Sequence, residues 1–338
     1  MHPKQAPLKH LVRMTTQIGL IQHSISDVPD LKRGYSIDDN ARALIVCLLF
    51  QKKYQTPFYS DYIKIYFSYI KKALTKNGFF HNFMDENGNF TDEFGSEDSF
   101  GRTVWALCSL IAQKDYNSAL SMEAKKIFDR VSVNFPKIKA LRARSFLILG
   151  LSLLGEKSLT HKLADQLVQL YQDESDLSWN WFEDELTYSN AIIPYSLFQS
   201  YLVTKNQKHL EVGLASLDFL VKTCHISGIP APIGQNGWHK KNGEKSLFDQ
   251  QLIDVADMVL ASEVAFKATK DPKYLKEVRR WFSWFSGHNI NSLSLFNPKT
   301  EGCFDALTKA GVNQNQGAES IIAYLLSYNS VLEITSDF

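Results

Sequence analysis

Two kinds of hydrophobic pattern alternate along this chain of 338 residues. In the first kind, as in FYSDYIKIYFSYIKKAL, apolar residues recur at steps of three and four, which predicts an amphipathic helix with a solvated face. The second kind, as in GRTVWALCSLIA, is apolar on nearly all sides, which predicts a helix enclosed by other helices. Segments of the first kind are 7–23, 59–75, 121–133, 158–173, 207–224 and 273–286; those of the second kind are 41–50, 101–112, 142–155, 190–203, 254–268 and 316–329.

This alternation predicts an all-α fold, the (α/α)6 toroid, in which six enclosed helices form an inner ring and six half-exposed helices surround it. Each interval between successive enclosed helices has room for one helical hairpin and a loop, so the pattern is that of a repeat architecture. No linker or change in composition interrupts it. We therefore expect a single domain over residues 1–338.

The loops differ in length according to the direction in which they connect the rings. Connections from an enclosed helix to the next half-exposed helix are short, whereas most of the reverse connections are long and rich in Gly, Asn, Asp and aromatic residues. Segments 78–94, 228–248 and 293–307 contain hairpin-like turns. All these long loops fall at one end of the toroid, and long ordered loops on a rigid scaffold are where function is expected.

Composition and charge exclude several classes of function. The formal net charge is +1 and both signs are mixed along the chain, which gives no basic patch for a nucleic acid or an anionic membrane. The four cysteines are scattered and lack the paired spacing of a zinc site, and the sequence contains no nucleotide-binding motif. We therefore expect no metal and no cofactor. No apolar run reaches the about 20 residues of a membrane span, and the first residues lack a signal-peptide core. We expect a cytoplasmic protein.

Acidic pairs stand at the starts of several enclosed helices. The sharpest occur in GYSIDDNAR (34–42), GSEDSFGR (95–102) and WNWFEDELTYSN (179–190). A lone acid at such a place caps free backbone N–H groups, but several pairs converging at one end would raise one another's pKa, as acid–base catalysis requires. A glycosidase needs one protonated and one ionised carboxyl group. The catalytic candidates are Asp38, Asp39, Glu97, Asp98, Glu183 and Asp184.

Other polar and aromatic residues in the same clusters are candidates for binding a substrate. Arginines in the first turns of enclosed helices either contact substrate or pair with the neighbouring acids. Aromatic residues in the loops either anchor the loops or stack on the apolar faces of sugar rings. One histidine on a long loop, in GWHKK, is the best candidate for the base of an epimerase. The substrate-binding candidates are Tyr35, Arg42, Arg102, Arg144, Trp179, Trp181, Tyr188, Asn190, Trp238, His239, Asp254, Asp257, Gln316 and Glu319.

The motifs GYSIDDNARA, SEDSFGR, WFEDELTYSNA and NQGAES resemble those of six-hairpin glycosidase-like proteins, and more narrowly bacterial (α/α)6 domains fused to, or grouped with, retaining glycosyltransferases. The resemblance covers essentially the whole chain. It implies an axial glycan-binding cleft, often inverting carboxylate catalysis at the six acids named above, and a possible glycosyltransferase partner. The group more often has an acid where Ser189 stands in this chain.

We expect a glycoside hydrolase or phosphorylase that acts on an oligosaccharide through two carboxylates and inverts the anomeric centre. Side chains of adjacent residues diverge by about 100° around a helix, so the two carboxylates should come from different hairpins, one from 38–39 and the other from 97–98 or 183–185. Two alternatives remain open. In the first, the chain is a sugar epimerase or isomerase with His239 as base. In the second, it is a non-catalytic glycan-binding domain that works with a glycosyltransferase.

Overall fold

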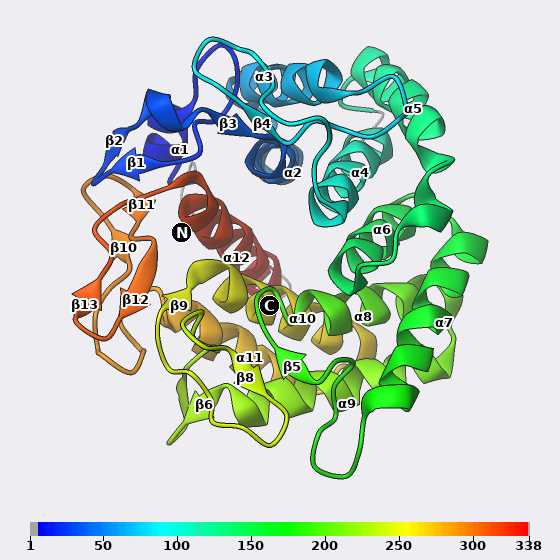
Figure 1. Cartoon of the computed structure of the whole chain (residues 1–338), viewed down its shortest axis with the longest axis vertical. Helices are drawn as coiled ribbons and strands as arrows, with labels where there is room; N and C mark the ends of the chain where they lie inside the picture. Colours follow the sequence, from blue (N-terminus) through cyan, green and yellow to red (C-terminus); the bar gives the residue numbers. More distant parts are fainter. Residues whose placement is uncertain (1–5, 114, 337–338) are drawn as a thin grey trace.

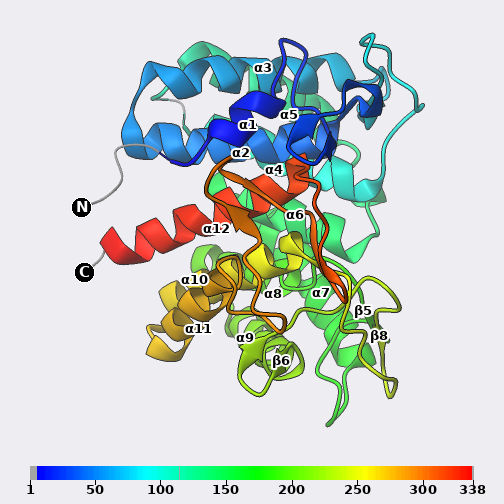
Figure 2. The ribbon, with the colours of Figure 1, turned by 90° about the vertical axis from the view of Figure 1, so that its left-hand side faces the viewer.

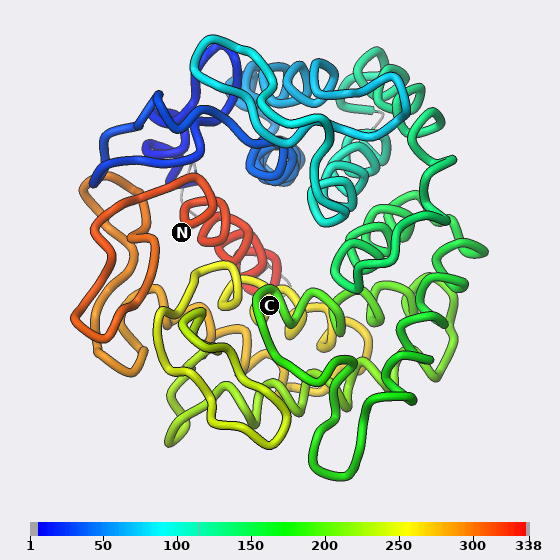
Figure 3. The backbone as a smooth tube through the Cα atoms, viewed as in Figure 1, coloured from blue at the N-terminus to red at the C-terminus, as the bar shows by residue number. Residues whose placement is uncertain are grey.

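The computed structural model describes residues 6–113 and 115–336, and it shows the predicted (α/α)6 toroid (Figure 1). Each inner helix contacts the next, and the last contacts the first, so the ring closes. The backbone runs around this ring in chain order (Figure 3). The inner helices are α2 (Ile37–Tyr54), α4 (Glu97–Ala112), α6 (Leu141–Leu153), α8 (Ile192–Thr204), α10 (Leu252–Thr269) and α12 (Ala318–Ser336).

Outer helices pack against the inner ring. They are α1 (Lys9–Met14), α3 (Pro57–Ala73), α5 (Ser118–Ser132), α7 (Lys157–Glu174), α9 (Gln207–Thr223) and α11 (Pro272–Ser283). The assignment of inner and outer rings is confirmed by burial. Every residue from Ser99 to Leu110 of α4 is buried, whereas α3 buries one face that includes Tyr59, Ile63 and Ile70. The apolar character on all sides of α4 is thus explained by neighbours on all sides.

The prediction of a helix over residues 7–23 is wrong beyond Met14. The helix ends there because Thr15 is extended, and the chain turns back in a bridge that pairs Thr15 with Leu20. The backbone N–H of Leu20 donates to Asn40 Oδ1 of α2 at 2.9 Å. Gly19 permits this close approach, since a Cβ there would lie 2.5 Å from the same oxygen. The amphipathic spacing therefore continues into a segment that a polar contact with α2 holds out of the helix.

Short strands lie in the loops at the end of the ring where the inner helices begin. Three pairings join segments that are distant in the sequence. They are β3 (Tyr35–Ser36) with β4 (Phe83–Met84), β5 (Glu185–Leu186) with β8 (His239–Lys240), and β9 (Gln250–Gln251) with β12 (Ala306–Thr308). In side view, β5 and β8 lie at the end of the ring opposite the one where α12 finishes (Figure 2). The remaining strands are β1 (Ser24–Ile25), β2 (Val28–Pro29), β6 (His225–Ile226), β7 (Ile229–Pro230), β10 (Phe296–Asn297), β11 (Gly302–Cys303) and β13 (Gly311–Val312).

The long loops therefore gather at one end, as the sequence predicts. The segment 78–94 turns back on itself through a bridge between Met84 and Phe90, and segment 293–307 holds the β10–β11 hairpin. Segment 228–248 instead sends β8 to pair with β5 of another loop, so the loops are tied to one another as well as to the helices. No helix in the described part of the chain is long and apolar enough to cross a membrane.

Candidate functional site

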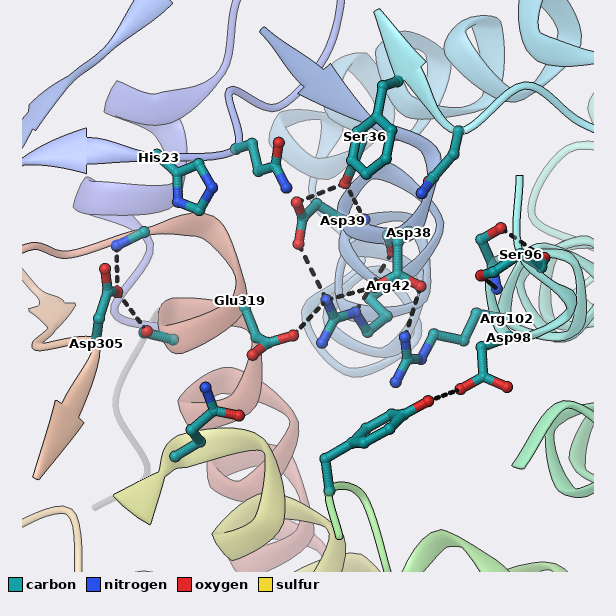
Figure 4. A pocket seen from close by; sticks show the side chains of 18 residues that line it. His23, Ser36, Asp38, Asp39, Arg42, Ser96, Asp98, Arg102, Asp305 and Glu319 are labelled. Carbon is teal, nitrogen blue, oxygen red and sulfur yellow. Dashed lines mark hydrogen bonds and ion pairs between the residues drawn. The ribbon is translucent and has the colours of Figure 1, made fainter. Parts of the chain in front are cut away.

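A cavity of about 430 Å³ opens at the loop end of the ring, above the first turns of α2, α4 and α12 (Figure 4). This volume falls within the ~300–1,000 Å³ typical of small-molecule sites. Its wall is polar and carries charges of both signs. Among the described residues, the charged side chains that line it, apart from one histidine, are Asp38, Asp39, Arg42, Asp98, Arg102, Asp305 and Glu319.

Helix capping places the acids of α2 in this wall. Ser36 is the N-cap residue, and its hydroxyl accepts the backbone N–H of Asp39 at 3.0 Å and donates to Asp39 Oδ2 at 2.6 Å. Asp38 and Asp39 thus occupy the first turn, where the helix dipole favours negative charge. Ser96 caps α4 in the same way, by accepting the backbone N–H of Ser99 at 3.1 Å, and this puts Asp98 into the facing first turn.

Arg42 joins three carboxylates at the floor of the cavity. Its Nη2 donates to Asp38 at 2.8 Å, to Asp39 at 3.0 Å and to Glu319 at 3.1 Å. Arg102 donates from Nη1 to the other oxygen of Asp38 at 2.8 Å. Both arginine side chains are buried, so little water competes with the two guanidinium groups for the carboxylate of Asp38.

The two neighbouring acids of α2 consequently differ in their affinity for a proton. Burial raises the pKa of Asp39 to about 7, with Arg42 opposing the rise and Asp38 adding to it. Burial acts on Asp38 as well, but Arg102 and Arg42 together outweigh it and hold the pKa of Asp38 below its usual range. One carboxyl group is therefore a fixed anion and the other exchanges a proton near neutral pH.

Asp98 faces the cavity from α4 and accepts a hydrogen bond of 2.6 Å from the hydroxyl of Tyr188. Burial, followed by the negative charge of Asp98, raises the pKa of Tyr188 to about 12, so this tyrosine remains a donor. The guanidinium of Arg142 lies 4.8 Å from the centre of the Tyr188 ring. The ring, which is itself partly exposed, is thus fixed between a cation and a carboxylate.

Two ionisable residues that line the cavity, Asp305 and His23, are not among the sequence-predicted candidates. Asp305 accepts hydrogen bonds of 2.6 Å from the backbone N–H of Gly317 and the hydroxyl of Ser320, at the start of α12. Burial raises its pKa. Its place in the long loop 293–307 was the available signal. His23 is exposed and belongs to the segment wrongly predicted as helix, and that error concealed it.

Other predicted catalytic acids do not line this cavity. Glu97 points to the start of α6, where its Oε2 accepts the backbone N–H groups of Lys139 and Ala140 at 2.6 Å each. Glu183 forms an ion pair of 3.1 Å with Arg142, and Asp184 is exposed beside β5. The expected shared cavity thus includes the 38–39 pair and Asp98 but not the 183–184 pair, because Arg142 holds Glu183 outside it.

The predicted aromatic wall is also absent from this cavity. Trp181 is fully buried between Phe182 and Phe219. Trp179 and His239 line a separate surface hollow of about 680 Å³. Tyr188 is the predicted aromatic residue that reaches the cavity. Both tryptophan rings pack against Phe219 of α9.

Most of the remaining substrate-binding candidates fix loops and helix starts. Trp238 packs near Tyr188, with ring centres 6.4 Å apart. The hydroxyl of Tyr35 contacts the hydroxyl of Thr16, and the guanidinium of Arg144 donates to the carbonyl of Ile138. Asn190 accepts a hydrogen bond from the guanidinium of Arg142, and Gln316 accepts one from the hydroxyl of Thr300. These partners explain why the four lie outside the cavity lining.

Two further acids lie deeper, on α10. Asp257 accepts a hydrogen bond from the hydroxyl of Ser189 and borders a space of about 20 Å³ beneath Arg42 and Arg102. Burial raises the pKa of Asp257 to about 6 and that of Asp254 well above its usual range. Ser189, at the position that the sequence resemblance singled out, thus supplies a hydroxyl that donates to Asp257.

Fold and cavity together define a six-hairpin toroid with an acidic axial site. No protein-family model matches the sequence, and a comparison with curated proteins finds no match. Solved structures do match. A sugar epimerase from a ruminal bacterium superposes with a TM-score of 0.75 at 13% identity, over 98% of this chain and 96% of that one.

Two more of these structures illustrate the range of activities on this fold. The cellobiose 2-epimerase of Bacillus thermoamylovorans has a TM-score of 0.73 at 12% identity, with 96% of each chain covered. The GH76 α-mannanase of Bacteroides thetaiotaomicron has a TM-score of 0.67 at 12% identity, over 98% of this chain and 95% of that one. These similarities confirm the six-hairpin fold, which serves both epimerases and hydrolases.

Proposed function

We propose that this chain is a carbohydrate-active enzyme that cleaves a glycosidic bond of an oligosaccharide in the cavity above α2, α4 and α12, by hydrolysis or phosphorolysis. In this proposal Asp39 donates a proton to the leaving oxygen and Asp98 activates the attacking water or phosphate. The observation that carries the proposal is the placement of these carboxyl groups on different hairpins of one cavity, in surroundings that make one of them a proton donor near neutral pH.

The electrostatic arrangement supports this division of roles. A general acid works best when its pKa lies near the operating pH, and the pKa of Asp39 is about 7. Asp98 is partly open to the cavity, and Tyr188 donates a hydrogen bond to it, which orients a carboxylate without neutralising it. Arg42 and Arg102, tied to Asp38, supply fixed positive charge at the floor. We propose inversion at the anomeric carbon, with the water or phosphate held between the two hairpins.

A panel of oligosaccharides, incubated with and without inorganic phosphate and followed by proton NMR of the anomeric signals, tests this proposal. We expect new reducing ends or sugar phosphates whose first-formed anomer is opposite to that of the substrate. Asp98→Asn and Asp39→Asn should each lower turnover by about 10²–10⁴-fold. Glu211→Gln, an exposed acid on α9, is the matched control and should leave turnover unchanged. Wild-type turnover in Asp98→Asn would refute the assigned base.

Epimerisation or isomerisation of a sugar is the second candidate, and His23 favours it. His23 lines the same cavity as the acids, and histidine is the side chain that most often acts as a general base in enzymes. Several of the matched structures are described as epimerases or as a D-mannose isomerase. The two candidates separate in deuterium oxide, because epimerisation incorporates solvent deuterium into an intact sugar and His23→Ala abolishes it, whereas hydrolysis leaves carbon-bound hydrogens in place.

A third outcome of the same assays is saturable glycan binding without turnover. That result would favour the glycan-binding alternative, in which the chain works beside a glycosyltransferase. The cavity acids would then bind sugar hydroxyls, and Asp98→Asn would weaken binding instead of lowering a rate.

A further inference from the structure

A second cluster of ionisable side chains lies on the outer ring, away from the acidic cavity. His161 and Asp165 stand one turn apart on α7, and His209 lies in the first turn of α9. These helix beginnings follow the short connections from inner to outer helices, at the end of the toroid opposite the cavity. In the described part of the chain, these three residues form the cluster of potential metal ligands, and one ligand atom from each lies within 4.8 Å of the others.

We propose that His161, Asp165 and His209 bind a divalent transition-metal ion of the zinc class, which links α7 to α9. Two imidazoles and one carboxylate are a donor set that Zn²⁺ accepts, with water in the fourth position. A tetrahedral centre with bonds of about 2.0–2.2 Å holds its ligand atoms a little over 3 Å apart. His161 Nε2 lies 3.3 Å from Asp165 Oδ2, and His209 Nε2 lies 2.9 Å from Asp165 Oδ1.

The buried histidine is oriented as a ligand would be. His209 is fully buried, and its Nδ1 lies 2.9 Å from the hydroxyl of Ser200. When Nδ1–H donates to that hydroxyl, the lone pair of Nε2 points at Asp165. Metal-binding histidines usually donate their second ring nitrogen in this manner to a neighbouring acceptor.

Nε2 of His209 has both an acceptor and a donor within hydrogen-bond distance. Asp165 Oδ1 requires Nε2 to donate a hydrogen, whereas the amide Nδ2 of Asn206, 3.2 Å away, requires it to accept one. The same amide nitrogen lies 3.4 Å from His161 Nδ1. A metal ion bound by the two Nε2 lone pairs and the Asp165 carboxylate replaces the contact between His209 and Asp165, and its binding requires the amide of Asn206 to turn away from the two rings.

The site is open enough to be loaded. The side chains of His161 and Asp165 are 48% and 50% exposed, so a hydrated ion reaches them from solvent and small rotations close the coordination. His209 supplies the fixed point. Because the site lies opposite the acidic cavity, we expect the ion to stabilise the packing of α7 on α9 without entering the chemistry at Asp39 and Asp98.

Calorimetric titration of the metal-free, tag-free full chain with Zn²⁺ tests the proposal. We expect one Zn²⁺ per wild-type chain, with affinity at least about tenfold lower in His161→Ala and in Asp165→Asn. His288→Ala removes another exposed histidine, after α11, and is the matched control that should bind like wild type. Zn²⁺ should raise the Tm of wild type and of the control but not of the two ligand variants.

Because His161 is half exposed, its alanine variant should fold, and circular dichroism of the metal-free proteins checks this directly. The proposal is overturned if the wild type shows no saturable Zn²⁺ binding. It is equally overturned if His161→Ala and Asp165→Asn retain both the affinity and the Tm increase of the wild type, since Zn²⁺ would then occupy some other group.

Discussion

Removal of Arg42 is the sharpest perturbation of the cavity floor. Its buried guanidinium donates to three carboxylates, at 2.8, 3.0 and 3.1 Å. An Arg42→Met variant keeps the apolar stem but leaves Asp38, Asp39 and Glu319 facing one another with Arg102 as the remaining cation at Asp38. Breaking a buried ion pair by removing one partner costs about 3–5 kcal/mol, and we expect a loss of that size in the free energy of unfolding at pH 8.

The loss should shrink as the pH falls. Arg42 lowers the pKa of both Asp38 and Asp39, so the folded variant takes up protons at a higher pH than the folded wild type does. A folded state that binds more protons gains stability as the pH decreases. The difference in unfolding free energy between wild type and Arg42→Met should therefore be clearly smaller at pH 5.5 than at pH 8.

Urea unfolding at the two pH values, followed by circular dichroism, measures both effects. Arg144→Met is the matched control, because Arg144 also lies on an inner helix, α6, but donates to the carbonyl of Ile138 instead of a carboxylate. Its loss should be small and independent of pH. A loss below about 1 kcal/mol in Arg42→Met, or an equal loss at both pH values, would refute the claim that buried charge pairing with Arg42 holds the floor together.

Two further substitutions test local structure. Glu97→Ala should cost about 0.5–2 kcal/mol of unfolding free energy, because Glu97 caps the start of α6 through Lys139 and Ala140; an unchanged urea midpoint would contradict this role. Gly19→Ala should cost about 1–3 kcal/mol, since its Cβ would lie 2.5 Å from Asn40 Oδ1 and 3.0 Å from the ring of Tyr69; a thermal melt equal to that of wild type would show that the segment has room to shift.

The sequence predicts the fold well because the fold depends on burial. A helix surrounded on all sides must be apolar on all sides, so residues such as Val104 and Leu107 of α4 identify the inner ring without structural information. The segment after Met14 escapes the same reasoning. Its spacing is amphipathic, but the hydrogen bond from Leu20 to Asn40 is a contact between distant residues, and periodicity carries no trace of it.

The site is predicted less completely because side-chain direction depends on partners outside the local pattern. Asp98 and Glu97 are adjacent and equally acidic, yet one reaches the cavity and the other caps α6. Glu183 resembles them in sequence context, but it pairs with Arg142. Position at a helix start is readable from the sequence. The choice between cavity and cap is decided by which backbone N–H groups or cations the neighbouring hairpin brings within reach.

The proton on Asp39 connects the stability of the protein with its proposed activity, and the pH dependence of each tests the connection. The pKa of this acid rises on folding from its usual 3.8 to about 7. Between about pH 4 and pH 7 the folded chain therefore holds a proton that the unfolded chain releases, so its contribution to the unfolding free energy falls as the pH rises through this window, by up to roughly 4 kcal/mol. A proton donor must also be protonated to act, so turnover should fall about tenfold per pH unit above pH 7. A histidine base would instead lose activity on the acid side, where it becomes charged. Both features should disappear in Asp39→Asn. If the alkaline decline in turnover persists in that variant while the stability slope vanishes, Asp39 is a buried structural acid and another group donates the proton.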